Sequence, residues 1–225
     1  IQRIYDGPAS GRGLETLLNR CFLASPSSQA VQNRRALLEN LLWEHAVASD
    51  GQPIRILSLG SGPGQELVDF VKRYRQAADY SALSIICVDV DLDALAYLRE
   101  QLSFEPTLSL TTIHQDIRRL TTSDLPQVDF AYAAGVFDYF SDPRAAAVLN
   151  VVWDALSEGG TFVLGNFADR RPIGDQFAMD HIMRWHLRYR DEQGLQRLVS
   201  RSRFGTAQRM LAEPNNINVF ALLQK

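Results

Sequence analysis

The sequence predicts an α/β fold in which a doubly wound, mostly parallel β-sheet ends in an antiparallel hairpin. Three observations predict it: apolar strands alternate with amphipathic helices over most of the chain, a glycine-rich turn follows the first strand, and Pro214-Asn215-Asn216 separates the last two apolar runs. Strands that alternate with helices imply right-handed crossovers, so the sheet is parallel and covered on both faces.

The individual elements are predicted from the period of their apolar residues. In chain order we expect a strand at 55–59, a helix at 65–77, a strand at 83–90, a helix at 92–102, strands at 108–114 and 129–134, a helix at 144–156, a turn at 157–160 and a strand at 161–166. The runs 207–213 and 217–223 flank the Pro-Asn-Asn turn and predict a hairpin that returns the chain to the sheet edge.

The first 50 residues predict a helical N-terminal segment. Residues 1–28 are rich in Gly, Ser and Pro, with one apolar helical turn at 14–18, and we interpret them as an entry segment or lid. Apolar positions at helical spacing predict an amphipathic helix at 29–48. We therefore expect an N-terminal helical or lid segment at 1–50 and a ligand-binding domain at 51–225, with an insertion at about 167–205.

Composition limits the classes of function. A chain of 225 residues with 46% hydrophobic content is long enough for one domain with a substantial core. Its net charge of -3 gives no global reason to bind nucleic acid.

The two cysteines, Cys21 and Cys87, predict no disulfide and a reducing compartment. No signal peptide or apolar run of about 20 residues is present, so we expect a soluble cytoplasmic protein with no membrane partner and no metal site. The chain begins at Ile1, which leaves open that it is part of a larger polypeptide.

The turn after the first strand carries glycines at positions 60, 62 and 64. Glycines let the backbone turn tightly and approach a ligand closely, and ligands of doubly wound sheets bind at the carboxyl ends of the strands. The turn therefore indicates a nucleotide-like ligand. A dinucleotide fingerprint would place a third glycine where Gln65 stands, so the spacing disfavours a dinucleotide.

Acidic residues follow the next two strands. Asp89 ends the second strand, where its carboxylate can accept hydrogen bonds from both hydroxyls of a ribose. Asp91 is better explained as the N-cap of the helix at 92–102. Asp116 follows the third strand, where it can accept a hydrogen bond from an adenine amino group or serve only as a turn residue.

Three motifs carry a resemblance to class I S-adenosylmethionine-dependent methyltransferases. They are Leu57-Ser58-Leu59-Gly60-Ser61-Gly62-Pro63-Gly64, Val88-Asp89-Val90-Asp91 and Gln115-Asp116-Ile117. The resemblance runs from about residue 54 to the end and implies a Rossmann-like methyltransferase fold with S-adenosylmethionine as cofactor. It implies that the glycine loop binds the methionine moiety, Asp89 the ribose, and Asp116 with the Ile117 backbone the adenine. The expected cofactor-binding residues are Gly60, Ser61, Gly62, Gly64, Asp89, Val90, Asp116, Ile117, Ala134 and Gly135. Ser58 departs from the family, because many members carry an acid there.

The residues that follow the fourth strand indicate which kind of atom accepts the methyl group. They lack the Asn/Asp-Pro-Pro-aromatic motif of exocyclic-amine methyltransferases and the cysteine of enzymes that methylate pyrimidine carbon. This favours O-methylation of a small molecule. Asp138 and Tyr139 are catalytic candidates, although an aspartate at a helix start and a tyrosine packed on a loop are also ordinary structural residues.

The segment 179–191 is the candidate acceptor site, together with Asn166 after the fifth strand. On a helix, Trp185 with Tyr189 and His186 with Arg190 would form two stripes that face the pocket. His186 would be the catalytic base for a hydroxyl acceptor, whereas Tyr189 or Arg190 would orient a carboxylate. A solvated amphipathic helix would equally explain this spacing.

Residues 133–139, 165–167 and 184–190 are also similar to a bacterial subgroup of methyltransferases that act on fatty-acyl or polyketide-like acids, including makers of 3-hydroxypalmitate methyl ester. This resemblance implies an O-methyltransferase of secondary metabolism whose small-molecule acceptor has a carboxyl or hydroxyl group on an apolar chain. The arginine-rich stretch 184–209 leaves RNA or protein methylation open. The sequence also leaves open a non-catalytic S-adenosylmethionine-binding module of a larger protein, and an oxidoreductase.

Overall fold

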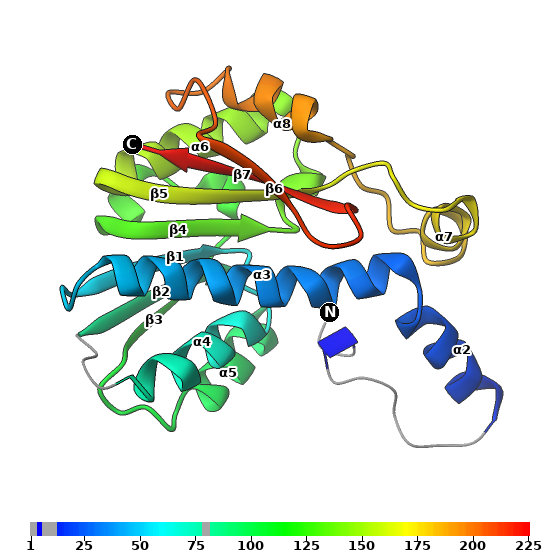
Figure 1. Cartoon of the computed structure of the whole chain (residues 1–225), viewed down its shortest axis with the longest axis horizontal. Helices are drawn as coiled ribbons and strands as arrows, with labels where there is room; N and C mark the ends of the chain where they lie inside the picture. Colours follow the sequence, from blue (N-terminus) through cyan, green and yellow to red (C-terminus); the bar gives the residue numbers. More distant parts are fainter. Residues whose placement is uncertain (1–3, 6–12, 78–81) are drawn as a thin grey trace.

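A computed structural model of the chain describes residues 4–5, 13–77 and 82–225 (Figure 1). Its strands are β1 (Ile54–Leu59), β2 (Leu83–Asp89), β3 (Ser109–His114), β4 (Val128–Ala134), β5 (Leu156–Phe167), β6 (Arg209–Ala212) and β7 (Asn218–Gln224). They form one seven-stranded sheet of order β3-β2-β1-β4-β5-β7-β6. Strands β1 to β5 are parallel, and β7 is antiparallel to both β5 and β6. The predicted doubly wound sheet with a terminal hairpin is confirmed.

The helices are α2 (Leu14–Leu23), α3 (Pro26–Ala48), α4 (Gln65–Arg75), α5 (Leu92–Gln101), α6 (Asp142–Ala155), α7 (Ile173–Phe177) and α8 (Glu192–Val199). Short 3-10 turns lie at Ile117–Arg119, Thr122–Asp124 and Phe137–Tyr139, and a π-helical turn at Ala178–Ile182 follows α7. Helices α3, α4 and α5 pack on one face of the sheet, and α6 and α8 pack on the other. The central strands are apolar almost throughout because both of their faces are covered. None of the helices in the described ranges has the length and apolarity needed to cross a bilayer.

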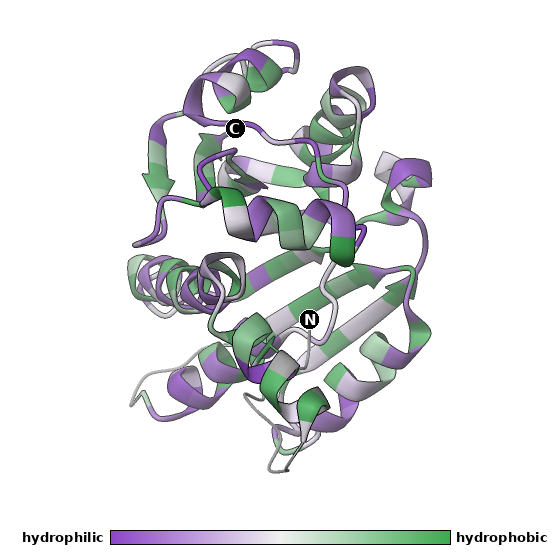
Figure 2. Ribbon diagram, turned by 90° about the vertical axis from the view of Figure 1, so that its right-hand side faces the viewer, coloured by the Kyte–Doolittle hydropathy of each residue, from purple (hydrophilic) through white to green (hydrophobic). Residues whose placement is uncertain are grey.

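The parallel strands end at the side of the molecule where α2, the first half of α3 and α7 project beyond the sheet (Figures 1 and 2). A third apolar cluster lies there and joins Ile4 to Ala30 and Val31 of α3, Phe167 at the end of β5, and Ile217. The N-terminal segment is therefore attached to the carboxyl edge of the sheet, where doubly wound proteins bind their ligands.

The N-terminus of α3 is held by residues on both sides of it. Ser25 is the N-cap, and its hydroxyl accepts a hydrogen bond from the Ser28 backbone. Asp175 of α7 accepts hydrogen bonds from the backbone and the hydroxyl of Ser27. A carboxylate is stabilised at a helix N-terminus by the free N–H groups and the helix dipole. Asp175 therefore docks the insertion onto the N-terminal segment.

Two local predictions are wrong. The turn expected at 157–160 lies within β5, where the register against β4 shifts between Val128 and Phe130. The helix considered for 185–190 is absent: the chain is irregular there. The Arg188 N–H donates to the carbonyl of Asp138 and the Arg190 N–H to that of Phe167, so these groups bond to other segments and not to the preceding turn. The two expected helical stripes therefore do not form.

Candidate active site

A cavity of about 710 Å³ lies at the carboxyl ends of β1, β2, β3 and β4. It is lined by Gly60, Gly62, Pro63, Asp89, Val90, Asp91, Asp93, Ala94, Tyr97, Asp116, Ile117, Arg118, Gly135, Val136, Tyr139 and Phe140. The predicted cofactor residues Gly60, Gly62, Asp89, Val90, Asp116, Ile117 and Gly135 are among these. Ser61, Gly64 and Ala134 are sequence neighbours of lining residues but do not line the cavity themselves. The three predicted motifs and the exit of β4 thus meet in one place.

The glycine loop fits a closely approaching ligand. Gly62 has a φ of +51°, and a Cβ placed on it would meet no described atom within 4 Å, so its bare backbone faces the cavity. Gly64 has a φ of +58° and its Cβ would lie 2.7 Å from Leu98, which leaves room for no larger residue. The open side of Gly62 is where the methionine moiety of S-adenosylmethionine would fit.

Asp89 connects the glycine loop to the end of β2. Its Oδ2 accepts a hydrogen bond of 2.7 Å from the Gly62 N–H, and its Oδ1 accepts one of 2.9 Å from the Asp91 N–H. Each carboxylate oxygen can accept a further hydrogen bond, so the residue remains able to bind both hydroxyls of a ribose. Asp91 itself accepts hydrogen bonds from Asp93 and Ala94, which confirms that it is the N-cap of α5.

Asp116 lies on the cavity wall beside Arg118. The guanidinium of Arg118 donates to both carboxylate oxygens at 2.6 to 2.9 Å, and these hydrogen bonds lower the pKa of Asp116 to about 2. The carboxylate is therefore ionised, and its position is fixed by a two-point contact. An adenine amino group that binds there would share these oxygens with Arg118.

Tyr139 lies where the cavity wall contacts the insertion after β5. Its side chain lines the cavity and is 53% exposed, and its hydroxyl accepts a hydrogen bond of 2.6 Å from the indole nitrogen of Trp185. The Trp185 ring packs edge-on against Phe167 with centroids 5.9 Å apart. Of the residues predicted on the acceptor side, Tyr139 lines the cavity, and Trp185 contacts it through this hydrogen bond.

Asp138, Asn166 and Arg190 form a buried network behind Tyr139. All five N–H donors of the Arg190 guanidinium are used, by the carbonyls of Phe137 and Phe140, by Asn166 and twice by Asp142. The Asn166 amide donates to two further carbonyls. This geometry favours a structural role for Arg190 and Asn166 over contact with a substrate.

Asp138 differs from these two residues because one of its oxygens has no partner. Its Oδ1 accepts a hydrogen bond of 2.6 Å from the Phe167 N–H, but its buried Oδ2 has no hydrogen-bond partner among the described residues. Burial raises the pKa of the carboxyl to about 6. Asp138 is therefore ionised at neutral pH and able to accept a proton.

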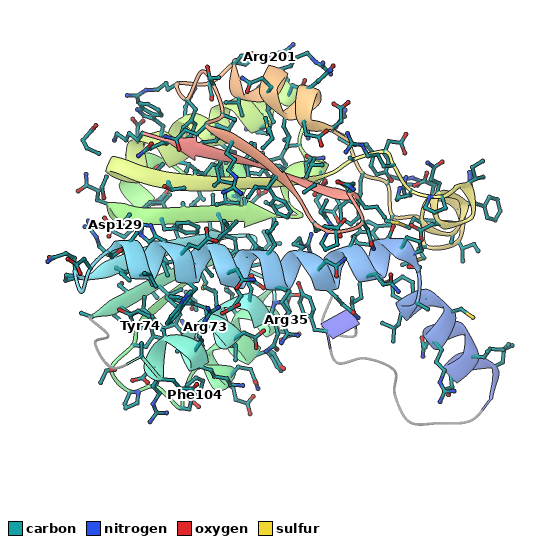
Figure 3. All side chains as sticks on the ribbon, viewed as in Figure 1. Arg35, Arg73, Tyr74, Phe104, Asp129 and Arg201 are labelled. Carbon is teal, nitrogen blue, oxygen red and sulfur yellow. The ribbon has the colours of Figure 1, made fainter. Side chains whose placement is uncertain are left out.

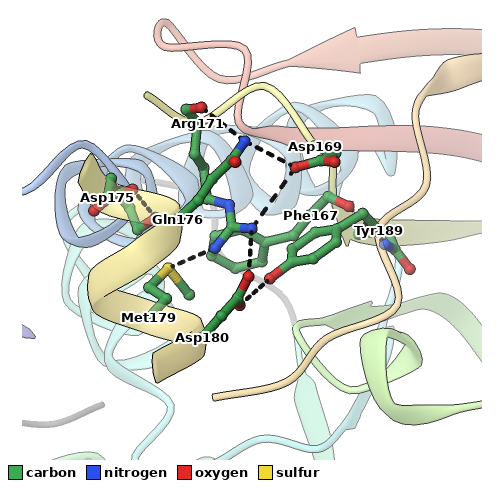
Figure 4. Close-up of polar contacts among 10 residues, drawn as sticks. Phe167, Asp169, Arg171, Asp175, Gln176, Met179, Asp180 and Tyr189 are labelled. Atoms are coloured by element: carbon green, nitrogen blue, oxygen red, sulfur yellow. Dashed lines mark hydrogen bonds and ion pairs between the residues drawn. The ribbon is translucent and has the colours of Figure 1, made fainter. Parts of the chain in front are cut away.

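His186 and Tyr189 lie away from the cavity. His186 is exposed and lines none of the described cavities. Tyr189 donates to Asp180 and packs under the guanidinium of Arg171, 4.2 Å from its ring centroid (Figure 4). Arg171 also lies near Asp169 and donates to the sulfur of Met179, so it connects the π-helical turn to the segment before α7. Burial raises the pKa of Tyr189 to about 12, so it stays protonated.

Several arginines of the stretch 184–209 are paired with carboxylates. Arg190 and Arg201 lie near Asp142, and Arg203 pairs with Asp154. The described structure thus offers less free positive charge there than the sequence suggests.

Sequence reasoning missed a group of buried ionisable residues beside the cavity. Arg34 of α3 is 4% exposed, and Glu66 of α4 accepts a hydrogen bond of 2.8 Å from the Tyr132 hydroxyl. Burial raises the pKa of Glu66. One signal was present: Arg34 stands three residues after Val31 and four before Leu38, which places it on the apolar face of the helix.

Comparison with known proteins agrees with this geometry. Residues 56–160 match a family model described as a methyltransferase domain. No curated protein sequence matches the chain. A protein from Bordetella parapertussis, described as a possible exported protein, has a similar structure (TM-score 0.78, 17% identity, 100% of this chain and 77% of that chain). So does magnesium protoporphyrin IX methyltransferase from Synechocystis PCC 6803 with bound S-adenosylhomocysteine (TM-score 0.68, 9% identity, 100% and 91%).

A third similar structure is an O-methyltransferase candidate from Nostoc punctiforme PCC 73102, with a TM-score of 0.65 and 15% identity over 88% of this chain and 58% of that chain. At these identities the similar structures show that the fold is shared. The match to a methyltransferase domain model and the predicted cofactor residues in the cavity wall are separate observations. Residues 56–160 therefore match a methyltransferase domain, the chain has the Rossmann-like fold of S-adenosylmethionine-dependent methyltransferases, and its cofactor is S-adenosylmethionine.

Proposed function

We propose that the protein is an O-methyltransferase that transfers a methyl group to a carboxyl or hydroxyl oxygen of a small, apolar acceptor. The observation that carries the proposal is the hydrogen bond between Trp185 and Tyr139. It brings the insertion onto the part of the cavity wall formed by Gly135, Val136 and Tyr139. An acceptor held there would be positioned for transfer of the cofactor methyl group.

The thiols of the chain do not support carbon methylation through a cysteine nucleophile. Cys87 is buried in β2, and burial raises its pKa well above the usual range of a thiol. Cys21 is exposed on α2, and neither cysteine belongs to the described walls of the cofactor cavity. An oxygen acceptor needs no such nucleophile.

Methyl transfer to an oxygen acceptor requires the protein mainly to position the acceptor against the cofactor. When bound, S-adenosylmethionine supplies an electrophilic methyl group on its sulfonium. A carboxylate acceptor is already ionised, so the protein has only to align it. A hydroxyl acceptor has to lose a proton, and Asp138 fits the role of base better than His186, because it is close to Tyr139 and its Oδ2 is unpartnered among the described residues.

An apolar groove supports an acceptor with a fatty-acyl or polyketide-like chain. It has a volume of about 530 Å³ and lies between α2, the start of α3, α7 and the π-helical turn. It is lined by Asn19, Cys21, Phe22, Ser25, Pro26, Gly174, Asp175, Ala178, Met179, Ile182 and Met183. Ile182 and Met183 are exposed there. Apolar side chains around a groove are typical of a site for an apolar ligand.

A panel of matched acceptors tests the proposal. The protein is incubated with S-adenosylmethionine and, in turn, with octanoic acid, 1-octanol and octylamine, and release of S-adenosylhomocysteine is measured. We expect turnover of the acid or the alcohol and none of the amine. Turnover of the amine alone, or methylation of added RNA or protein but of neither oxygen acceptor, would contradict the proposal.

A further inference from the structure

Arg34 is a buried cation at the carboxyl end of β4. It projects from α3, is 4% exposed, and its Nη1 lies so close to Gly135 that a Cβ on that glycine would be 2.6 Å away. Gly135 lines the cofactor cavity. The guanidinium therefore lies directly behind a residue of the cavity wall, although Arg34 is not itself among the residues that line the cavity.

No carboxylate in the described ranges forms an ion pair with Arg34. The hydroxyl of Tyr5 is its polar neighbour, and that group is neutral. The next residue on the helix behaves differently, because Arg35 pairs with Asp69 at 2.5 Å. A charge taken out of water without an opposite charge is strongly destabilising, so buried charges in native proteins are paired, and a bound ligand can supply the partner.

The acidic groups nearby do not fill this role. The carboxylate of Glu66 is bonded to the Tyr132 hydroxyl, and Asp138 uses Oδ1 for the Phe167 backbone. Both carboxyls nevertheless feel the charge of Arg34, which lowers their pKa values against the opposing effect of burial. Arg34 is thus close to the site, and within residues 4–5, 13–77 and 82–225 no carboxylate forms an ion pair with it.

We propose that Arg34 binds the carboxylate of a ligand of this active site. A guanidinium presents a planar fork of N–H donors that matches a carboxylate. The carboxylate has two sources: the acceptor acid, or the methionine end of the cofactor. The proposal rests on the proposed function, since it concerns the same site.

Two binding measurements distinguish the sources. In the first, calorimetry compares S-adenosylmethionine with decarboxylated S-adenosylmethionine. In the second, it compares octanoate with 1-octanol on protein saturated with S-adenosylhomocysteine. We expect the wild-type protein to prefer the carboxylate ligand by about tenfold in one of the two pairs. Arg34→Gln should abolish that preference, and the affected pair identifies the source.

Arg35→Gln is the matched control, because Arg35 is the adjacent residue and points to the side of α4 (Figure 3). It should keep the preference. Retention of the preference by Arg34→Gln, or no preference of the wild-type protein in either pair, would overturn the proposal.

Thermal unfolding measures whether the Arg34 variants are still folded. Without ligand, Arg34→Gln should melt close to the wild-type temperature, because the loss of a buried charge without a direct ion pair and the loss of its attraction for the buried carboxyls of Asp138 and Glu66 act in opposite directions. It should lose the upward shift that the carboxylate ligand gives the wild-type protein. Arg34→Lys, which keeps the charge but not the fork, should retain part of the preference and the shift, and full retention by Arg34→Lys would argue against a two-point contact.

These readouts need no turnover. A carboxylate preference that depends on Arg34 would stand even if neither octanoic acid nor 1-octanol were methylated, which would count against O-methylation alone. Oxygen methylation with unchanged binding in Arg34→Gln would count against the role of Arg34 alone.

Discussion

Trp185 donates a hydrogen bond of 2.6 Å from its indole nitrogen to the hydroxyl of Tyr139, 46 positions earlier in the chain. Tyr139 belongs to the cavity wall, whereas Trp185 belongs to the insertion after β5. The contact therefore joins the cavity wall to the segment that we propose as the acceptor side.

Trp185→Phe should weaken the use of the acceptor and leave cofactor binding intact. The variant keeps a ring against Phe167 but loses the donor to Tyr139. Loss of one such hydrogen bond corresponds to a decrease of about tenfold in kcat/KM for the acceptor. Steady-state kinetics and calorimetry with S-adenosylhomocysteine measure the two effects. A weaker cofactor affinity with unchanged acceptor kinetics would show that the contact belongs to the cofactor site.

Asp89→Ala should lower the affinity for S-adenosylmethionine at least about tenfold, because the ribose contact and the hydrogen bond from Gly62 are both lost. Calorimetric titration measures it. Asp91→Ala is the control: it removes the N-cap of α5 and should lower the free energy of unfolding by about 1 kcal/mol, with a much smaller effect on affinity. Unchanged affinity in Asp89→Ala would leave Asp89 with only a structural role.

Asp138→Asn should change how stability depends on pH. The carboxyl has a pKa of about 6 in the folded protein and 3.8 as its ordinary value, so between these values the folded state holds a proton that the unfolded state releases. Stability therefore falls as pH rises through this window. Asparagine cannot ionise and can still accept the hydrogen bond from Phe167.

The variant should remove this fall, which amounts to about 3 kcal/mol at most. Urea unfolding at a series of pH values measures it. An unchanged pH profile would mean that Asp138 is not a source of this dependence. If Asp138 is the base, the same variant should stop methylation of 1-octanol but not of octanoate.

Arg190→Met should destabilise the protein by about 3 to 5 kcal/mol, because it removes five hydrogen bonds in a buried network. Arg201→Met is the matched control. Arg201 pairs with the same Asp142, but it is exposed and the distance is 3.8 Å, so its loss should cost less than about 1 kcal/mol. Denaturant unfolding compares the two. A similar small effect of both changes would show that Arg190 is dispensable for folding.

The cofactor side could be predicted from the sequence because its signals are local. Gly62 lies in the turn that follows β1 and Asp89 is the last residue of β2, and the cap at Asp91 depends only on the next three residues. Parallel strands then bring these positions to one edge of the sheet, so the motif spacing already determines the site.

The acceptor side could not be predicted in this way, because its geometry depends on contacts between distant segments. The spacing of Trp185, His186 and Arg190 suggested a helix, but the backbone between them is held by Asp138 and Phe167. In the sequence, Arg34 and Arg35 are two neighbouring arginines of one predicted helix. In the structure they differ, because Arg34 lies beside Gly135 at the end of β4 whereas Arg35 pairs with Asp69.

The position of the transferred methyl group tests the central claim most directly. The protein is incubated with S-adenosylmethionine that carries carbon-13 in its methyl group, together with octanoic acid and 1-octanol, and the product is identified by carbon-13 NMR. Our account predicts a labelled methyl carbon bonded to oxygen, in a methyl ester or a methyl ether. A labelled methyl bonded to nitrogen or carbon, or no transfer by protein that has bound the cofactor, would contradict it.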